Sequence, residues 1–395
     1  MRNRIYILNL LFLFPMWMSK TLQPLFWEME GKLFLFSASY VAMAIAGTFS
    51  LWYANLIRRS GIKRGLVLGF LLYGAGLILR AYPVNFPLAI LTGLIAGIGA
   101  SVTGLALKGL ILEIDEEKRK SVILQTDNIY TLSQSLGAMA AGLLVSILAL
   151  FMNNGFQWSL VITGLLTISA LTCIPNHSQL ASHSLPETSL QKTQIRYSFP
   201  ANKILYSTIF IAFFINGACW AIFLPLIPIY LKGLNMTPAQ IGLVISGGVI
   251  AGFLLKNIYI IINKHAANNI SLGVFTVLTA SAISLSFLFF GRGDGVLFGI
   301  SIIAFYMFRT VLALIIDLIE MHIAGRGNAM SVFGIRQTAF LSGDVAGGIA
   351  MPFFFKSGVL IPHVLLLVSM IAIASFLIAS CAKLSEKHVW KATLN

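Results

Sequence analysis

Long apolar runs, each of about 20 residues, recur from one end of this sequence to the other. A helix needs about 20 apolar residues to cross the hydrocarbon core of a bilayer. Of the 395 residues 58% are hydrophobic and only 10% are charged, whereas a soluble domain carries about a quarter charged residues. The alternating ten-residue strands typical of outer-membrane barrels are absent from the sequence. The sequence therefore predicts an all-α polytopic membrane protein.

Hydropathy predicts twelve transmembrane spans. The longest polar stretch, 175–202, is rich in Ser, Gln and His and divides the spans into two sets of six. It predicts a flexible cytoplasmic linker between two six-helix bundles, at 1–174 and 203–395. The predicted spans are 5–27, 33–57, 62–82, 86–112, 122–150, 157–174, 203–231, 238–262, 270–290, 295–320, 328–355 and 359–382.

Lysine and arginine are distributed unevenly between the two sides that these spans define. With the N-terminus inside, most of the 27 Lys and Arg residues fall in cytoplasmic segments, and few, Arg80 among them, fall in outer segments. The positive-inside rule then places both termini in the cytoplasm of an inner-membrane protein. It also explains the net charge of +14 without a nucleic-acid partner.

Several charged residues lie inside the predicted spans. Such groups are costly in hydrocarbon, so they face the protein interior or a watery cavity, where they pair or mark a solute or proton pathway. The embedded carboxylates are Asp127, Asp317 and Asp344. The embedded cations are Lys20, Lys108, Lys256, Arg309 and Arg336.

The stretch 302–355 concentrates these charges on two neighbouring helices. Arg309 and Asp317 share a helix face with Tyr306, and Arg336 and Asp344 lie on the next helix beside small residues. At 1.5 Å per residue, Arg309 and Asp344 lie at similar depths, as do Asp317 and Arg336. We expect these two ion pairs. They either lock the helices together or belong to a gating and proton-coupling pathway.

Polar residues in four other spans are further candidates, each with a structural alternative. Lys108 either lines a cavity or extends along its helix toward the cytoplasm. Asp127 is either a gate residue or a solvated helix start. A cavity wall or helix packing would each account for Lys20 and Gln23 of the first span and for Asn216 and Trp220 of the seventh.

The two halves resemble each other at an offset near 205 residues. For example, the small-residue run 137–142 parallels 343–348, which predicts a duplicated six-helix unit. With the long central loop and the segments Pro225–Tyr230 and Leu91–Gly99, this organisation resembles the major facilitator superfamily. That resemblance implies secondary active transport by alternating access, with spans one, four, seven and ten around the cavity.

The chain also departs from the family pattern. The loop Arg58-Arg59-Ser60-Gly61 keeps the Gly and the basic residues of the family's loop between spans two and three, but Arg58 replaces its Asp. The conformational latch that uses this Asp must therefore be altered. Gly343-Asp344 resembles the Gly-Pro of the family's exporters, but Asp344 replaces the Pro. It also lies in the second half of the chain, whereas the exporters have their motif in the first half. These motifs assign no subfamily.

Motifs for other chemistry are missing from the sequence. No nucleotide-binding loop, catalytic triad or paired-cysteine metal motif occurs, so we expect neither an enzyme nor a cofactor or metal. We expect a monomer whose partners are a small-molecule substrate, the bilayer and a proton or other coupling ion.

The embedded charges predict the class of solute. Cations outnumber carboxylates in the spans, so a proton-coupled carrier of an organic anion is the leading hypothesis. If Lys20 and Lys108 turn away and Asp344 neutralises Arg309, the cavity is apolar and fits an efflux carrier of drugs or metabolites. A non-transporting receptor or scaffold is the alternative from another class.

Overall fold

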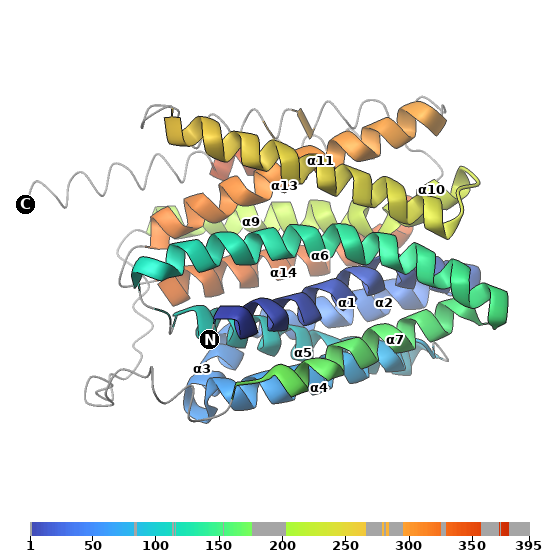
Figure 1. Cartoon of the computed structure of the whole chain (residues 1–395), viewed down its shortest axis with the longest axis horizontal. Helices are drawn as coiled ribbons and strands as arrows, with labels where there is room; N and C mark the ends of the chain where they lie inside the picture. Colours follow the sequence, from blue (N-terminus) through green and yellow to red (C-terminus); the bar gives the residue numbers. More distant parts are fainter. Residues whose placement is uncertain are drawn as a thin grey trace, which may run out of the picture.

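The computed structural model describes residues 2–82, 85–112, 114, 116–152, 154–175, 203–265, 279, 282–283, 295–324, 329–356, 371 and 373–378. Within these ranges every regular element is helical (Figure 1). The N-terminal helices are α1 (Arg2–Met29), α2 (Leu33–Thr48), α3 (Ser50–Ser60), α4 (Ile62–Leu79), α5 (Phe86–Leu112), α6 (Glu116–Phe151), α7 (Gly155–Ser169) and the 3-10 turn η1 (Ala170–Cys173). The C-terminal helices are α9 (Lys203–Phe223), the 3-10 turn η3 (Leu224–Leu226), α10 (Ile227–Gly233), α11 (Pro238–His265), α13 (Gly295–Ala324) and α14 (Ala329–Lys356).

The helices have the length and surface of membrane spans. Eight spans in the described part of the chain are long and apolar enough to cross a bilayer, and α2 is a shorter apolar helix. Large apolar side chains are exposed on their outer faces, for example Phe151 at 79% and Phe353 at 74%. Such exposure suits lipid rather than water. The predicted spans 270–290 and 359–382 fall largely outside the described residues.

Two predicted spans are broken where the prediction was continuous. The second consists of α2 and α3, which separate at Phe49. The seventh changes from α9 through η3 to α10 around Pro225 and Pro228, because proline lacks the N–H that continues an α-helix. In contrast, α1 runs unbroken through Pro15 and Pro24.

The N-terminal and C-terminal helices form two groups (Figure 1). In that view α4 and α7 lie at the bottom, α11 and α13 at the top, and α1, α2, α6 and α14 between them. The groups meet where α6 packs on α11 and α2 packs on α14. Gly142 and Gly242 bring α6 and α11 together. A Cβ on Gly142 would lie 2.2 Å from the carbonyl oxygen of Pro238, and one on Gly242 would lie 2.5 Å from that of Ala138.

The two small-residue runs that are parallel in sequence also pack alike. A Cβ on Gly137 of α6 would lie 2.8 Å from the carbonyl oxygen of Phe14 in α1. A Cβ on Gly343 of α14 would lie 1.9 Å from the carbonyl oxygen of Phe214 in α9. Small residues allow helix backbones to approach this closely in membranes. The first glycine of each run therefore packs its helix against the first helix of its own group.

Candidate solute cavity

A cavity of about 360 Å³ lies between the two groups of helices. Its volume falls in the range of small-molecule binding sites. Helices α1, α2, α4 and α5 line one side, and η3, α10, α11, α13 and α14 line the other. Its charged and polar lining side chains are Ser19, Lys20, Thr21, Gln23, Tyr40, Tyr73, Arg80, Ser101, Lys108, Tyr306, Gln337 and Asp344.

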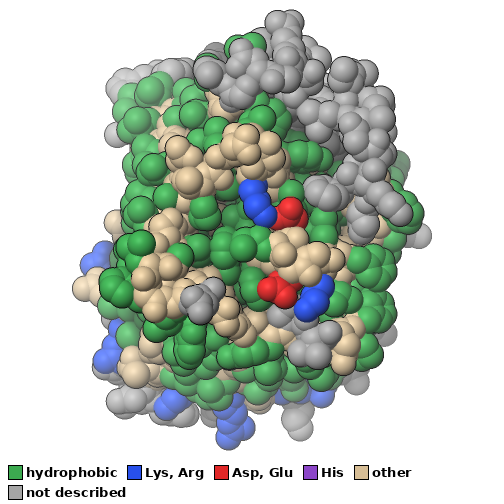
Figure 2. All heavy atoms as spheres, turned by 90° about the vertical axis from the view of Figure 1, so that its right-hand side faces the viewer, with side chains coloured by type: hydrophobic (Ala, Val, Ile, Leu, Met, Phe, Trp, Pro, Cys, Tyr) green, Lys and Arg blue, Asp and Glu red, His purple; other side chains and the backbone are tan. Residues whose placement is uncertain are grey.

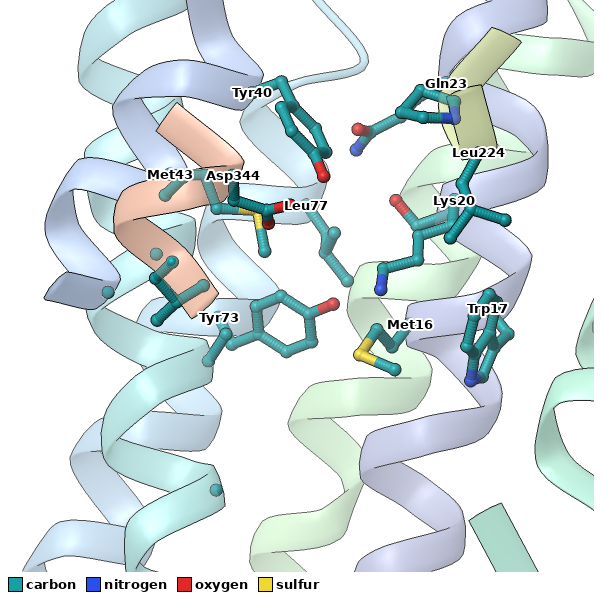
Figure 3. A pocket seen from close by; sticks show the side chains of 18 of the residues that line it. Met16, Trp17, Lys20, Gln23, Tyr40, Met43, Tyr73, Leu77, Leu224 and Asp344 are labelled. Carbon is teal, nitrogen blue, oxygen red and sulfur yellow. The ribbon is translucent and has the colours of Figure 1, made fainter. Parts of the chain in front are cut away.

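Lys20 and Asp344 face this cavity from opposite groups of helices. Lys20 lies well inside α1, yet its side chain is exposed. Figure 3 shows it extending from one wall toward the space that Asp344 of α14 and the hydroxyls of Tyr40 and Tyr73 reach from the other. Lys20 and Asp344 both line this space. The cavity therefore combines a cation and a carboxylate that come from different halves of the chain.

The predicted ion pair between Arg309 and Asp344 is not formed, since the ion pairs among the described residues do not include it. The Arg309 guanidinium carbon lies 5.1 Å from the ring centroid of Trp220 and 5.9 Å from that of Trp17. These indole faces attract the guanidinium through a cation–π interaction. Similar depth along two helices was therefore insufficient, because Arg309 of α13 lies against these two indole rings and not at Asp344.

The structure brings together five of the predicted site residues. Lys20, Gln23, Lys108, Tyr306 and Asp344 all line the cavity. Lys108, whose side chain is exposed, is among the residues that line this cavity. The site residues that the prediction added beyond these five are Asn216, Trp220, Asp127, Asp317, Arg309 and Arg336.

Of these six residues, the five whose side chains the structure describes do not line the cavity. Asn216 and Trp220 are both buried in α9 outside the lining. The Arg336 guanidinium lies 5.2 Å from the ring of Phe213. The side chain of Asp317 lies outside the described part of the structure, so its predicted pair with Arg336 stays a prediction.

Asp127 lies in the contact between the two groups rather than in the cavity. Lys256 Nζ of α11 donates a hydrogen bond of 2.7 Å to Asp127 Oδ2 and one of 3.1 Å to Thr131 Oγ1. One turn farther along α6 the hydroxyls of Ser135 and Ser246 are 2.7 Å apart. The interpretation of Asp127 as a merely solvated helix start is therefore wrong, because its carboxylate joins the halves.

Sequence analysis missed several lining residues. Arg80 was assigned to an outer loop, but its side chain is buried at 4% exposure and reaches the cavity. Its Nε donates to the Ser39 hydroxyl at 2.9 Å and its Nη2 to the Ser39 carbonyl at 3.0 Å. Tyr40, Tyr73 and Gln337 carry no sequence signal beyond an ordinary place in an apolar helix.

The end of the bundle at which α1 finishes is bridged between the two groups. Lys232 of α10 forms an ion pair with Glu28 of α1, and the Ser37 hydroxyl of α2 donates to the Gly348 carbonyl of α14 at 2.8 Å. Figure 2 shows this end, with basic and acidic side chains adjacent near the centre of a largely hydrophobic face. These bridges link the helix groups beyond the cavity.

Two groups of helices with a charged cavity at their junction are the arrangement of a carrier that alternates access to its site. A family model described as Major Facilitator Superfamily matches residues 5–348. The chain therefore belongs to the major facilitator superfamily. It is a multi-pass membrane protein and a secondary transporter of small solutes, which defines it as a transporter rather than an enzyme.

Solved structures share this fold at low sequence identity. A point mutant of the nucleoside transporter NupG is 15% identical with a TM-score of 0.71, and the match covers 96% of this chain and 99% of that one. A D-xylose-proton symporter is 13% identical with a TM-score of 0.70, over 95% and 96% of the two chains. A POT family transporter in complex with 5-aminolevulinic acid is 12% identical with a TM-score of 0.71, over 97% and 96%. Among curated proteins none matches this sequence.

Proposed function

We propose that this protein is a proton-coupled carrier that moves a small organic anion across the inner membrane by alternating access. The observation that carries the proposal is the charge of the cavity. Lys20 and Arg80 line it, whereas Asp344 is the carboxylate among its described lining residues. Excess positive charge in a low-dielectric cavity is unfavourable, and a bound anion neutralises it.

Asp344 is the proton carrier in this proposal. In the empty cavity Lys20 faces Asp344 and balances its charge (Figure 3). When Lys20 binds the anion of the solute, Asp344 loses this balance and takes up a proton, because an isolated carboxylate is unfavourable at this depth. One proton then accompanies each anion. A proton symporter is among the solved structures that share the fold.

The test compares solutes of similar size that differ in charge. Binding to the purified full-length protein in detergent is measured by thermal stabilisation for three sets: gluconate and glucose, hexanoate and hexanamide, and benzoate, benzamide and benzylamine. We expect a carboxylate to bind and its neutral or cationic partners to fail. Lys20→Gln should weaken that binding at least 30-fold, about 2 kcal/mol, because it removes the cation that pairs with the anion.

Lys32→Gln is the matched control, because Lys32 pairs with Glu30 outside the cavity lining at a separation of 3.5 Å. It should leave the affinity unchanged. The anion proposal fails if an amide or amine binds as tightly as its carboxylate, or if Lys20→Gln binds like the wild type.

A drug or metabolite exporter with a mainly apolar cavity is the second candidate. Phe12, Met16, Phe36, Leu77 and Phe340 form much of the lining and favour it. That function requires hydrophobic cations or neutral solutes to bind without help from Lys20, and the same panel measures this.

For the orientation, we propose that both termini and the segment 175–202 are cytoplasmic, as the distribution of Lys and Arg predicts. Leu185→Cys, in a chain whose native cysteines are replaced by serine, should resist an impermeant thiol reagent in intact cells and react after lysis. Labelling in intact cells would contradict this topology.

A further inference from the structure

Aromatic side chains dominate the wall of the cavity beside Lys20. Trp17, Tyr40 and Tyr73 surround the space that Lys20 enters (Figure 3). Tyr73 packs on Phe12 with 5.4 Å between ring centroids, and Tyr40 packs on Phe36 at 6.2 Å. These contacts hold the rings in place from behind. The aromatic residues of the lining are Phe12, Trp17, Phe36, Tyr40, Tyr73, Tyr306 and Phe340.

The cationic end of the cavity is built around one of these rings. Lys20 Nζ lies 4.6 Å from the Trp17 ring centroid, and the Arg309 guanidinium carbon lies 5.9 Å from the same centroid. Two positive charges therefore share one indole, and Trp17 itself is only 5% exposed. The field of both cations is strongest beside this ring, which makes it the favoured place for a negative group.

Unused hydrogen-bond donors lie at the same end. Gln23 is one turn of α1 from Lys20 and only 4% exposed, and its amide points across the cavity toward Tyr40 (Figure 3). Among the described residues its Nε2 atom and the Nε1 atom of Trp17 have no hydrogen-bond partner. Buried donors without a partner are uncommon, because each costs free energy. An acceptor on a bound solute would satisfy the Gln23 amide.

From this geometry we infer that the transported solute is a small aromatic carboxylate. The inference rests on the proposed anion function and names its substrate class. The carboxylate binds to Lys20 and Gln23 in the field of Arg309, and the ring lies among the aromatic walls, where Tyr73 contacts it. A cavity of about 360 Å³ suits a compact solute built on a single ring.

An amino acid fits this cavity less well than a simple acid. The described carboxylate that would receive an ammonium group is Asp344, which already faces Lys20 and the Tyr40 hydroxyl. Arg80, which also lines the cavity, would repel an added ammonium. The remaining imbalance is positive, so it favours a solute that brings only negative charge.

Three probes of similar size test separately whether the aromatic ring and the negative charge of the solute contribute to binding. Isothermal titration of the purified full-length protein compares benzoate, cyclohexanecarboxylate, which has a saturated ring, and benzamide, which has no charge. We expect benzoate to bind about fivefold tighter than cyclohexanecarboxylate, since a favourable aromatic pair contributes roughly that factor. Benzamide should bind at least 30-fold weaker than benzoate.

Variants of Tyr73 test whether this residue causes the preference for an aromatic ring. Tyr73→Leu should remove the preference for benzoate over cyclohexanecarboxylate, whereas Tyr73→Phe, which keeps the ring, should retain it. Phe34→Leu is the control, because Phe34 is 64% exposed on the outer surface, and it should change nothing.

Each outcome bears on a different claim. Equal binding of benzoate and cyclohexanecarboxylate overturns the aromatic inference but leaves the anion function standing. Equal binding of benzoate and benzamide overturns the anion function. If none of the three probes binds, the aromatic inference is likewise overturned, while the other carboxylates of the wider panel still test the anion function.

Discussion

Replacing Asp127 by Asn should destabilise this protein more than replacing its partner Lys256 by Met. The Lys256 side chain is 1% exposed and that of Asp127 is 20% exposed. Asp127→Asn leaves the buried ammonium with the Thr131 hydroxyl and a neutral amide. Lys256→Met leaves a carboxylate that still reaches water. Losing Asp127 therefore leaves a buried charge without its carboxylate, whereas losing Lys256 leaves a charge that water can still solvate.

The magnitudes follow from that difference. Removing one partner of a buried pair typically costs about 3–5 kcal/mol. Because Asp127 is partly exposed, we expect about 3 kcal/mol for Asp127→Asn. For Lys256→Met we expect about 1–2 kcal/mol, the lower part of the range of about 1–3 kcal/mol for a buried group that loses its partner, because water still reaches Asp127. The double variant should recover most of this loss, because neutral groups then replace both charges.

Equilibrium unfolding in graded SDS, followed by tryptophan fluorescence, measures these free energies, and the double-mutant cycle gives the coupling energy. We expect a coupling of at least about 1 kcal/mol, well above the error of additivity for independent sites. The reasoning is refuted if the two single effects simply add in the double variant, or if Lys256→Met is the more damaging change.

Two further predictions use the same assay. Gly343→Ala should cost about 1–3 kcal/mol, because its Cβ would lie 1.9 Å from the backbone oxygen of Phe214. Gly104→Ala should be neutral or slightly stabilising, because nothing lies within 4 Å of a Cβ there. Equal losses at both sites would contradict the packing. Glu28→Gln should change the unfolding free energy by less than about 1 kcal/mol, since the side chains of Lys232 and Glu28 are 37% and 31% exposed; a loss of several kcal/mol would show that this bridge is effectively buried.

The sequence predicted the helices well because the bilayer imposes a strong requirement on length and polarity. The span predicted at 86–112 coincides with α5 (Phe86–Leu112). The interruption at Phe49 was missed because no proline marks it, and the nearby Gly47 does not stand out among the many glycines of the predicted spans. Prolines alone could not identify the change of helix type at Pro225, since prolines also occur in the unbroken α1.

The candidate site was predicted in part. Helical spacing and charge selected Lys20, Lys108 and Asp344, because an ionisable group deep in a span has few reasons to be there. Spacing gives the depth of a residue but not which helix it faces, so the pairing of Arg309 with Asp344 was wrong. Arg80 was missed since its position near the end of a span looks like a loop in sequence.

The pair of Asp127 and Lys256 shows the same limit. The two residues are 129 positions apart and belong to different groups of helices, so no local pattern connects them. Sequence analysis identified both as embedded charges. Only the packing of α6 on α11 shows that each neutralises the other.

The most direct test of the account is accumulation of the tightest-binding carboxylate in proteoliposomes under a pH gradient, with passive diffusion subtracted using protein-free liposomes. The wild type should concentrate the anion in the direction of proton flow. Asp344→Asn should retain exchange of internal for external anion but lose accumulation driven by the gradient, because the residue that carries the proton is gone. Wild-type accumulation by Asp344→Asn, or accumulation of the neutral isostere instead of the anion, would contradict the account.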